Sequence, residues 1–175
     1  MPRPYYIGRY EVTQEEWQRV MGVNPSLEGE GGRYPVNYVP WEVLQEFLSK
    51  TGFRLPTENE WEYACRFGSG SQRYGQLDDI AWHIGHPVAG FPAVLHEVGM
   101  KTPNPLGLYD MFGNVAELTS DRLTSDDPSW VCETYYVGRG CPQSGWDHEF
   151  RASFRYVTDI SERDCDLGVR VVRDP

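Results

Sequence analysis

Helix signals and strand signals occupy different parts of this chain of 175 residues. Thr13 and Thr57 each precede a glutamate three residues later, which is the pattern of an N-terminal capping box. Short runs rich in β-branched and aromatic residues, bounded by turn formers, follow in the last third of the chain. This order of helices before strands, with much irregular chain between them, predicts an α+β fold.

Local sequence signals predict where these elements begin and end. Gly22 and Gly52 are expected to end the first two helices, because glycine readily adopts the left-handed conformation of a helix C-cap. Residues 68–105 are rich in Gly, Pro and His and are expected to form long ordered loops. The expected helices span residues 13–22, 41–52 and 57–68, and the expected strands span residues 5–12, 115–119, 130–137, 150–156 and 168–173.

Composition limits the class of partner. The chain has 16 Lys and Arg against 26 Asp and Glu, which gives a formal net charge of −10. Such a surface repels phosphate backbones and anionic lipid, so we expect no nucleic-acid partner. No apolar run is long enough to cross a bilayer and the N-terminus lacks the apolar segment of a signal peptide, so no membrane insertion is expected. The length favours one domain over residues 1–175.

The cysteines do not form a recognisable motif. Cys65, Cys132, Cys141 and Cys165 lie far apart, and no CxxC or Cys/His cluster has the spacing of a zinc site. Free thiols in a reducing compartment are the expected state. A disulfide between Cys132 and Cys141 remains open, because spacing alone does not decide the geometry.

Five separated sequence blocks carry a specific pattern, which includes RLPTENEWEYA and PNPLGLYDMFGNV. The blocks cover residues 6–13, 35–39, 54–64, 103–115 and 167–173. Together they resemble the formylglycine-generating enzyme (sulfatase-modifying factor) domain. The resemblance implies a C-type-lectin-like fold of the formylglycine-generating-enzyme subtype, with two main helices, a small antiparallel sheet and a high irregular content.

The resemblance stops at the catalytic cysteines. Enzymes of this family use a cysteine pair that follows a motif like Arg-Gly-Gly-Ser-Trp, and the corresponding stretch here is RGCPQSGWDHEFR at 139–151. His148 and residues near 152–153 stand where the thiols are expected, while Cys141 and Cys165 lie outside that spacing. The chain is therefore expected to be no enzyme and to require no cofactor. The alternative is a formylglycine-generating-enzyme-like oxidase or other enzyme with an altered active site, using Cys141 or Cys165 with His148.

The tail keeps the family's framework residues but changes those between them. The framework positions are Arg139, Gly140, Trp146, Arg151, Arg155, Arg163, Leu167, Gly168 and Arg170. No Asn follows Asn114, and nearly all the intervening residues are ones that an Asn codon yields when its adenines are replaced; Glu149 and Glu162 are exceptions. In this the chain resembles the variable proteins of diversity-generating retroelements, in which an adenine-directed process rewrites a C-terminal region.

That second resemblance implies a non-catalytic protein that displays a hypervariable ligand-binding surface over residues 139–173. Aromatic side chains supply contact area at low entropic cost, and Asp or His adds polar specificity. We expect the partner to be a protein or cell-surface ligand and the chain to bind it as a monomer. Whether the domain is displayed on a virion or on a cell surface stays open. The expected contact residues are Trp146, Asp147, His148, Phe150, Phe154, Tyr156, Val157, Thr158, Ile160, Ser161, Asp164, Cys165 and Asp166. Alternatively, Phe150, Phe154 and Val157 pack in the core of a late strand pair.

A calcium site is also suggested by the family resemblance. Side-chain oxygens of Asp110 and Glu117, with backbone carbonyls of Gly113 and Val115, are hard ligands of the kind that Ca²⁺ prefers. The alternative is that hydrogen bonds or an arginine hold the two carboxylates.

Overall fold

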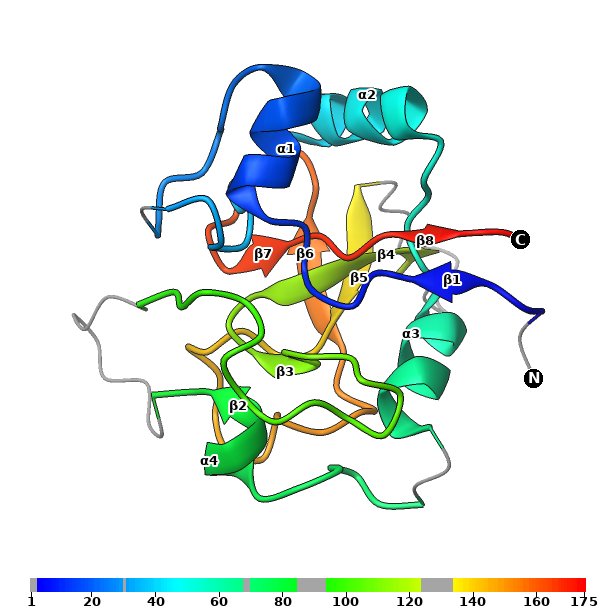
Figure 1. The fold of residues 1–175 in the computed structure, drawn as a ribbon, viewed down its shortest axis with the longest axis vertical. Coiled ribbons are helices and arrows are strands. Elements are labelled where there is room, and N and C mark those ends of the chain that lie inside the picture. The colour runs from blue at the N-terminus through cyan, green and yellow to red at the C-terminus, as the bar shows by residue number, and fades with distance from the viewer. Residues whose placement is uncertain (1–2, 30, 68–69, 85–93, 124–133) are drawn as a thin grey trace, which may run out of the picture.

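The computed structural model describes residues 3–29, 31–67, 70–84, 94–123 and 134–175. The helices are α1 (Gln14–Met21), α2 (Trp41–Thr51), α3 (Glu58–Arg66) and α4 (Leu77–Ile80), and the strands are β1 (Tyr6–Ile7), β2 (Ala81–Trp82), β3 (Phe112–Gly113), β4 (Ala116–Arg122), β5 (Tyr135–Arg139), β6 (Tyr156–Asp159), β7 (Leu167–Gly168) and β8 (Val172–Arg173). In Figure 1, α1 and α2 lie at one end of the molecule, α4 lies at the other end, and strands and long loops lie between them.

The two capping boxes form as the sequence predicts. The Thr13 hydroxyl accepts a hydrogen bond from the Glu16 backbone, and the Glu16 carboxylate accepts one from the Thr13 backbone N–H at 3.0 Å. Thr57 and Glu60 repeat this arrangement at the start of α3. Gly22 ends α1 in the left-handed region, with a φ of 82°.

The main sheet has the strand order β6-β5-β4-β7. β5 is antiparallel to both of its neighbours, β6 and β4, and the short β7 runs parallel to β4. The strand expected over 150–156 begins only at Tyr156, because the residues before it fold into a turn around the buried Phe150. Of the strand expected over 130–137, the part at 130–133 lies outside the described residues.

Two apolar clusters form the core. One lies beneath α1 and α2, where the rings of Trp17 and Phe47 stack with centroids 4.5 Å apart. The other contains Trp61 of α3, Phe112 and Phe150. The tail therefore contributes directly to the core, and part of it is unavailable to solvent.

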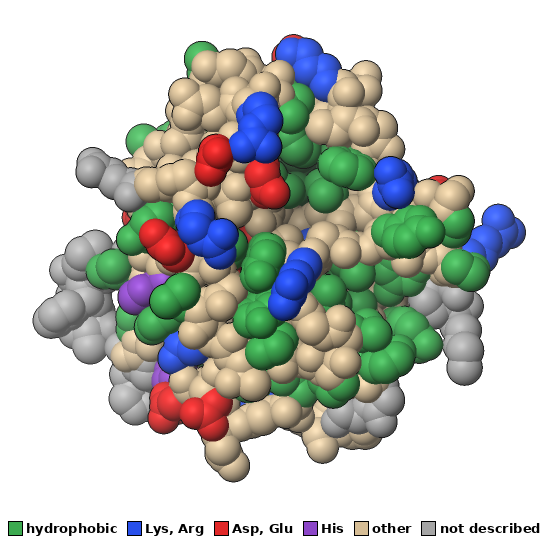
Figure 2. Space-filling view, in the orientation of Figure 1, with side chains coloured by type: hydrophobic (Ala, Val, Ile, Leu, Met, Phe, Trp, Pro, Cys, Tyr) green, Lys and Arg blue, Asp and Glu red, His purple; other side chains and the backbone are tan. Residues whose placement is uncertain are grey.

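β1, near the start of the chain, and β8, near its end, lie side by side (Figure 1). β1 pairs antiparallel with β8, with Tyr6 opposite Arg173. On the face in Figure 2, basic and acidic side chains are interspersed, so the negative net charge is not gathered there. Within the described ranges, no helix combines the length and the apolar character that crossing a bilayer requires.

Candidate ligand-binding surface

Arginine side chains hold the turn that precedes β6 through its main-chain oxygens. Arg73 Nε donates to the Phe150 carbonyl at 2.5 Å, and its Nη2 donates to the carbonyl of Asp147. Arg151 donates to the carbonyl of His148. Because these bonds reach main-chain atoms, they do not depend on which side chains stand at positions 147 and 148.

Arg139 ties the same turn to α3. Its side chain is 3% exposed, and it donates to the Ala152 carbonyl at 2.5 Å and to Glu58 at 3.0 Å. It also pairs with Glu62. Burial acts to raise the pKa of the Glu62 carboxyl, but hydrogen bonds from Arg66 and Arg139 outweigh burial and lower this pKa below its usual value. The buried guanidinium is thus matched by carboxylates, as a buried charge requires.

Arg170 is the second buried framework arginine. Its Nε and Nη2 lie 2.8 and 2.6 Å from the two Glu117 oxygens. It also donates to the carbonyls of Gly8 and Tyr109, at 2.9 and 2.7 Å. The indole N–H of Trp61 donates to Glu117 at 2.5 Å. One side chain from the tail therefore joins the N-terminal segment, the central loop and β4.

These contacts do not fit the proposed calcium ligands. The Arg170 guanidinium lies against both Glu117 oxygens, so a cation already occupies that position. Asp110 accepts from the Gly99 N–H at 2.7 Å, and burial raises the pKa of its carboxyl, which disfavours the charged form that a metal needs. Among the described residues, no group of three or more His, Cys, Asp and Glu side chains has an arrangement that would hold a metal.

The expected contact residues divide by burial. The exposed ones are Trp146, Asp147, His148, Val157 and Ser161, and the half-buried ones are Phe154, Tyr156, Ile160, Asp164, Cys165 and Asp166. Phe150 and Thr158 are buried, because Phe150 packs in the apolar cluster that contains Trp61 and Thr158 lies opposite Tyr136 in the sheet. These two side chains are not accessible to a ligand.

Two hydrogen bonds bring three tail segments together. Ser144 Oγ donates to Asp166 at 2.7 Å, and the Tyr156 hydroxyl donates to Asp164 at 2.6 Å. The turn at 144–148, the start of β6 and the loop at 164–166 therefore lie next to one another. We call these residues the tail surface: 144, 146–148, 156 and 164–166.

Other expected residues lie away from this surface. Val157 points to the opposite face of β6 from Tyr156, because successive strand residues alternate. Ile160 lines a small cleft with Trp41 and Leu118. Sequence reasoning missed Ser144 and Arg73. Both act through partners distant in sequence, so no local pattern marks them.

The thiols near this surface are poor nucleophiles. Cys141 is fully buried, and burial raises the pKa of its thiol well above its usual 9.0. Burial and then the neighbouring Glu28 raise the pKa of Cys165. Since the thiolate is the reactive form, neither cysteine is activated. Cys65, Cys141 and Cys165 are free thiols, and Cys132 lies outside the described residues.

The sequence and fold place the chain in a known family. Residues 1–175 match the model of the sulfatase-modifying factor enzyme 1-like domain, so the chain belongs to this family. It is 29% identical over 230 residues to the chaperone protein LppX of Paenibacillus barcinonensis, covering 97% of this chain and 80% of that one. It is 32% identical to the formylglycine-generating enzyme of Streptomyces coelicolor over 77% of this chain, but spans only 43% of that enzyme.

Among solved structures, the chain is similar to Treponema denticola variable protein 1. The two superpose with a TM-score of 0.83 and 28% identity, over 98% of this chain and 84% of that one. PvdO from Pseudomonas aeruginosa gives a TM-score of 0.79 with 26% identity, over 99% of this chain and 81% of that one. The predicted α+β, C-type-lectin-like fold and the predicted resemblance to a variable protein are confirmed.

Proposed function

We propose that the chain is a non-catalytic ligand-binding protein, the product of a diversity-generating retroelement, that presents a hypervariable tail surface to a protein or cell-surface ligand. The observation that carries this proposal is the separation of roles within the tail. The framework residues Arg139 and Arg170 are 3% and 0% exposed, whereas the intervening residues Asp147 and His148 are exposed beside the framework residue Trp146, which is itself 48% exposed.

This separation suits a surface that changes in sequence while its backbone stays fixed. Arg73, Arg139 and Arg151 bind carbonyl oxygens of the turn, so replacing side chains at 147 and 148 removes none of those bonds. Rigid aromatic groups beside small polar ones are also typical of antibody contact surfaces. The structural similarity to a variable protein supports the same reading.

Non-catalytic binding is favoured over an altered enzyme by the state of the thiols. An enzyme built on Cys141 or Cys165 with His148 needs an accessible thiol with a lowered pKa, and burial raises the pKa of both. Cys141→Ser and Cys165→Ser variants, assayed for copper binding and for reaction with a thiol reagent, test this directly. A copper-dependent turnover lost in either variant would favour the enzyme.

The genetic test examines where sequence variation falls. We expect related gene copies to differ at codons 147–148, 156–157, 161 and 164–166, and to agree at Arg139, Trp146, Arg151 and Arg170. A reverse transcriptase gene and a near-repeat of the tail codons are expected in the flanking DNA. Variation spread evenly along the chain would overturn the proposal.

A protein-level test uses two matched display libraries. One randomises positions 147, 148 and 165 on the tail surface, and the other randomises the exposed positions 15, 18 and 19 of α1. Both libraries should fold, but selection against a panel of cell-surface proteins should enrich binders from the tail library. Equal enrichment from both libraries would count against a dedicated surface.

A further inference from the structure

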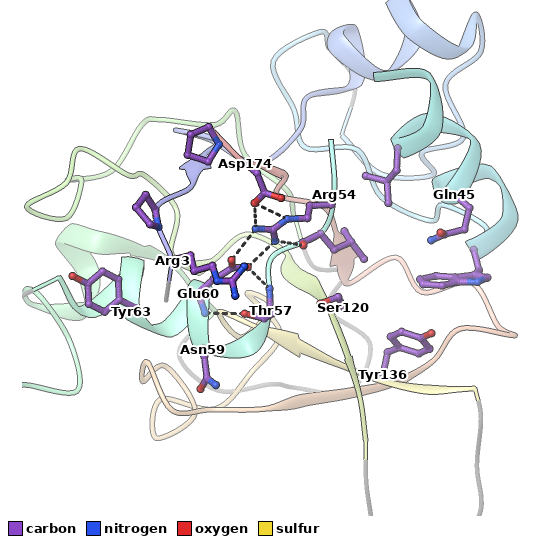
Figure 3. A pocket seen from close by; sticks show the side chains of 15 residues that line it. Arg3, Gln45, Arg54, Thr57, Asn59, Glu60, Tyr63, Ser120, Tyr136 and Asp174 are labelled. Atoms are coloured by element: carbon purple, nitrogen blue, oxygen red, sulfur yellow. Dashed lines mark hydrogen bonds and ion pairs between the residues drawn. The ribbon is translucent and has the colours of Figure 1, made fainter. Parts of the chain in front are cut away.

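A second concave site lies apart from the tail surface. A groove of about 1400 Å³ opens between α2, the start of α3 and the strands β4 and β5 (Figure 3). This exceeds the roughly 300–1,000 Å³ of small-molecule pockets, so the groove suits an elongated occupant. Its aromatic and uncharged polar lining includes Trp41, Gln45, Asn59, Tyr63, Ser120 and Tyr136.

The charges in the groove are balanced. The two terminal nitrogens of Arg54 each lie 2.8 Å from a Glu60 oxygen, and Nη2 also lies 2.7 Å from Asp174. The hydrogen bond from Arg54 lowers the pKa of Asp174, and the charges of Arg54 and Arg3 lower it further. Burial acts in the opposite direction but does not outweigh them. Two guanidinium groups thus face two carboxylates, and no excess charge attracts an ion.

Apart from Pro4, Leu48, Leu55 and Pro175, the remaining lining consists of aromatic rings and uncharged polar groups. The half-buried Trp41 covers the buried Tyr136 on one side, with ring centroids 4.7 Å apart, and Tyr63, 40% exposed, lies on the other side. Between and beside them, the amides of Gln45 and Asn59 and the hydroxyl of Ser120 are exposed (Figure 3). Amides and hydroxyls both donate and accept hydrogen bonds without adding charge.

We propose that this groove binds a neutral saccharide chain. A sugar ring presents C–H groups on its faces and hydroxyls at its rim, which match aromatic faces and uncharged amides. Trp41 and Tyr63 on the two sides, with the amides and hydroxyl near them, allow contacts to more than one sugar unit.

The same observations disfavour peptide occupants. An added strand needs an unpaired edge, but in the groove the Ser120 N–H of β4 already donates to the Pro56 carbonyl at 2.9 Å, and β5 pairs with β4 and β6 on its two sides. An amphipathic helix needs an apolar stripe, but among the groove's described residues only Tyr63 is a strongly exposed large apolar side chain.

Calorimetric titration of the full chain tests the proposal. The probes are hexasaccharides of glucose, mannose, xylose and N-acetylglucosamine, with a heparin hexasaccharide and a proline-rich peptide as comparisons. At least one neutral hexasaccharide should bind. Gln45→Ala and Asn59→Ala should each weaken its affinity about three- to tenfold, as expected for a lost hydrogen bond. Tyr63→Ala should weaken it at least as much.

The controls separate this site from the tail surface. Gln18→Ala removes an exposed amide from α1 and should leave the affinity unchanged. Trp146→Ala on the tail surface should also leave it unchanged, so either proposal can fail without the other. Binding of only heparin or the peptide, no binding by any neutral hexasaccharide, or binding indifferent to the Gln45, Asn59 and Tyr63 variants would overturn the proposal.

Discussion

Arg170 and Glu117 form a two-pronged ion pair in which both side chains are wholly inaccessible to solvent. The pair joins the last segment of the chain to β4 and is completed by bonds to Trp61 and to two main-chain carbonyls. Removing one partner leaves the other as an uncompensated buried charge.

Arg170→Met should therefore lower the free energy of unfolding by about 3–5 kcal/mol, measured by urea denaturation. Arg19→Ala, which breaks an exposed ion pair with Glu15, should cost no more than about 1 kcal/mol. The double variant Arg170→Met with Glu117→Leu should recover part of the loss. Equal losses in the Arg170 and Arg19 variants would contradict this account.

Glu11 should make stability depend on pH. Burial and then the charge of Asp110 raise the pKa of Glu11 well above its usual 4.5. Between pH 4.5 and the raised folded pKa, the folded protein therefore holds a proton on Glu11 that the unfolded chain has lost. The contribution of Glu11 to stability is full below pH 4.5 and is lost as pH rises through the folded pKa. Relative to the unaltered protein, Glu11→Gln should become progressively more stable as pH rises.

Urea midpoints at a series of pH values measure this difference. Gln18→Ala, at an exposed position of α1, changes no titratable group, so it provides the comparison and should show no such trend. A difference between Glu11→Gln and the unaltered protein that stays constant with pH would refute the assignment.

Two aromatic residues of the tail should respond differently to truncation. Phe150 is fully buried, so Phe150→Ala should cost about 3–5 kcal/mol through the cavity it leaves. Trp146 is 48% exposed, and Trp146→Ala should cost about 1 kcal/mol or less while reducing ligand binding. Thermal and urea unfolding of both variants check this, and a smaller loss for Phe150→Ala than for Trp146→Ala would be inconsistent with the structure.

The turn before β6 should tolerate changes in its own side chains but not in Arg73. Asp147→Ala and His148→Ala should each change stability by less than about 0.5 kcal/mol, because both side chains are exposed. Arg73→Ala removes the donor to the Phe150 carbonyl and should cost about 1–3 kcal/mol. Comparable losses in all three variants would show that side chains, and not main-chain bonds, hold the turn.

Calcium should not alter the melting temperature. The Glu117 oxygens bind Arg170, so neither calcium nor a chelator has a carboxylate pair to act on there. Differential scanning calorimetry with calcium and with EDTA measures this. A stabilisation by calcium that disappears in Glu117→Gln would establish the site that these contacts disfavour.

Local signals predicted the helices well, since a capping box or a terminal glycine lies within a few residues of the element it controls. Thr13 with Glu16 and Thr57 with Glu60 are of this kind. The tail was harder to predict because Trp146 and Phe150 are both aromatic and close in sequence. Only the packing of α3 against the tail decides which of them is buried.

The groove and the arginine network were beyond sequence reasoning for the same reason. Arg73 acts on a carbonyl 77 positions away, and Arg170 acts on a carboxylate 53 positions away. Such partners become neighbours only when the chain is folded. The family resemblance marked Arg139 and Arg170 as framework positions, but their partners came from the structure.

The pairing of Tyr6 with Arg173 has a consequence for how this domain can be carried. These two residues lie about one strand spacing, roughly 4.8 Å, apart. A host protein could therefore receive the whole domain within a single surface loop, with little cost for closing that loop. The same closeness suits a circular permutant, in which a linker joins the segments that flank β1 and β8 and new ends open elsewhere.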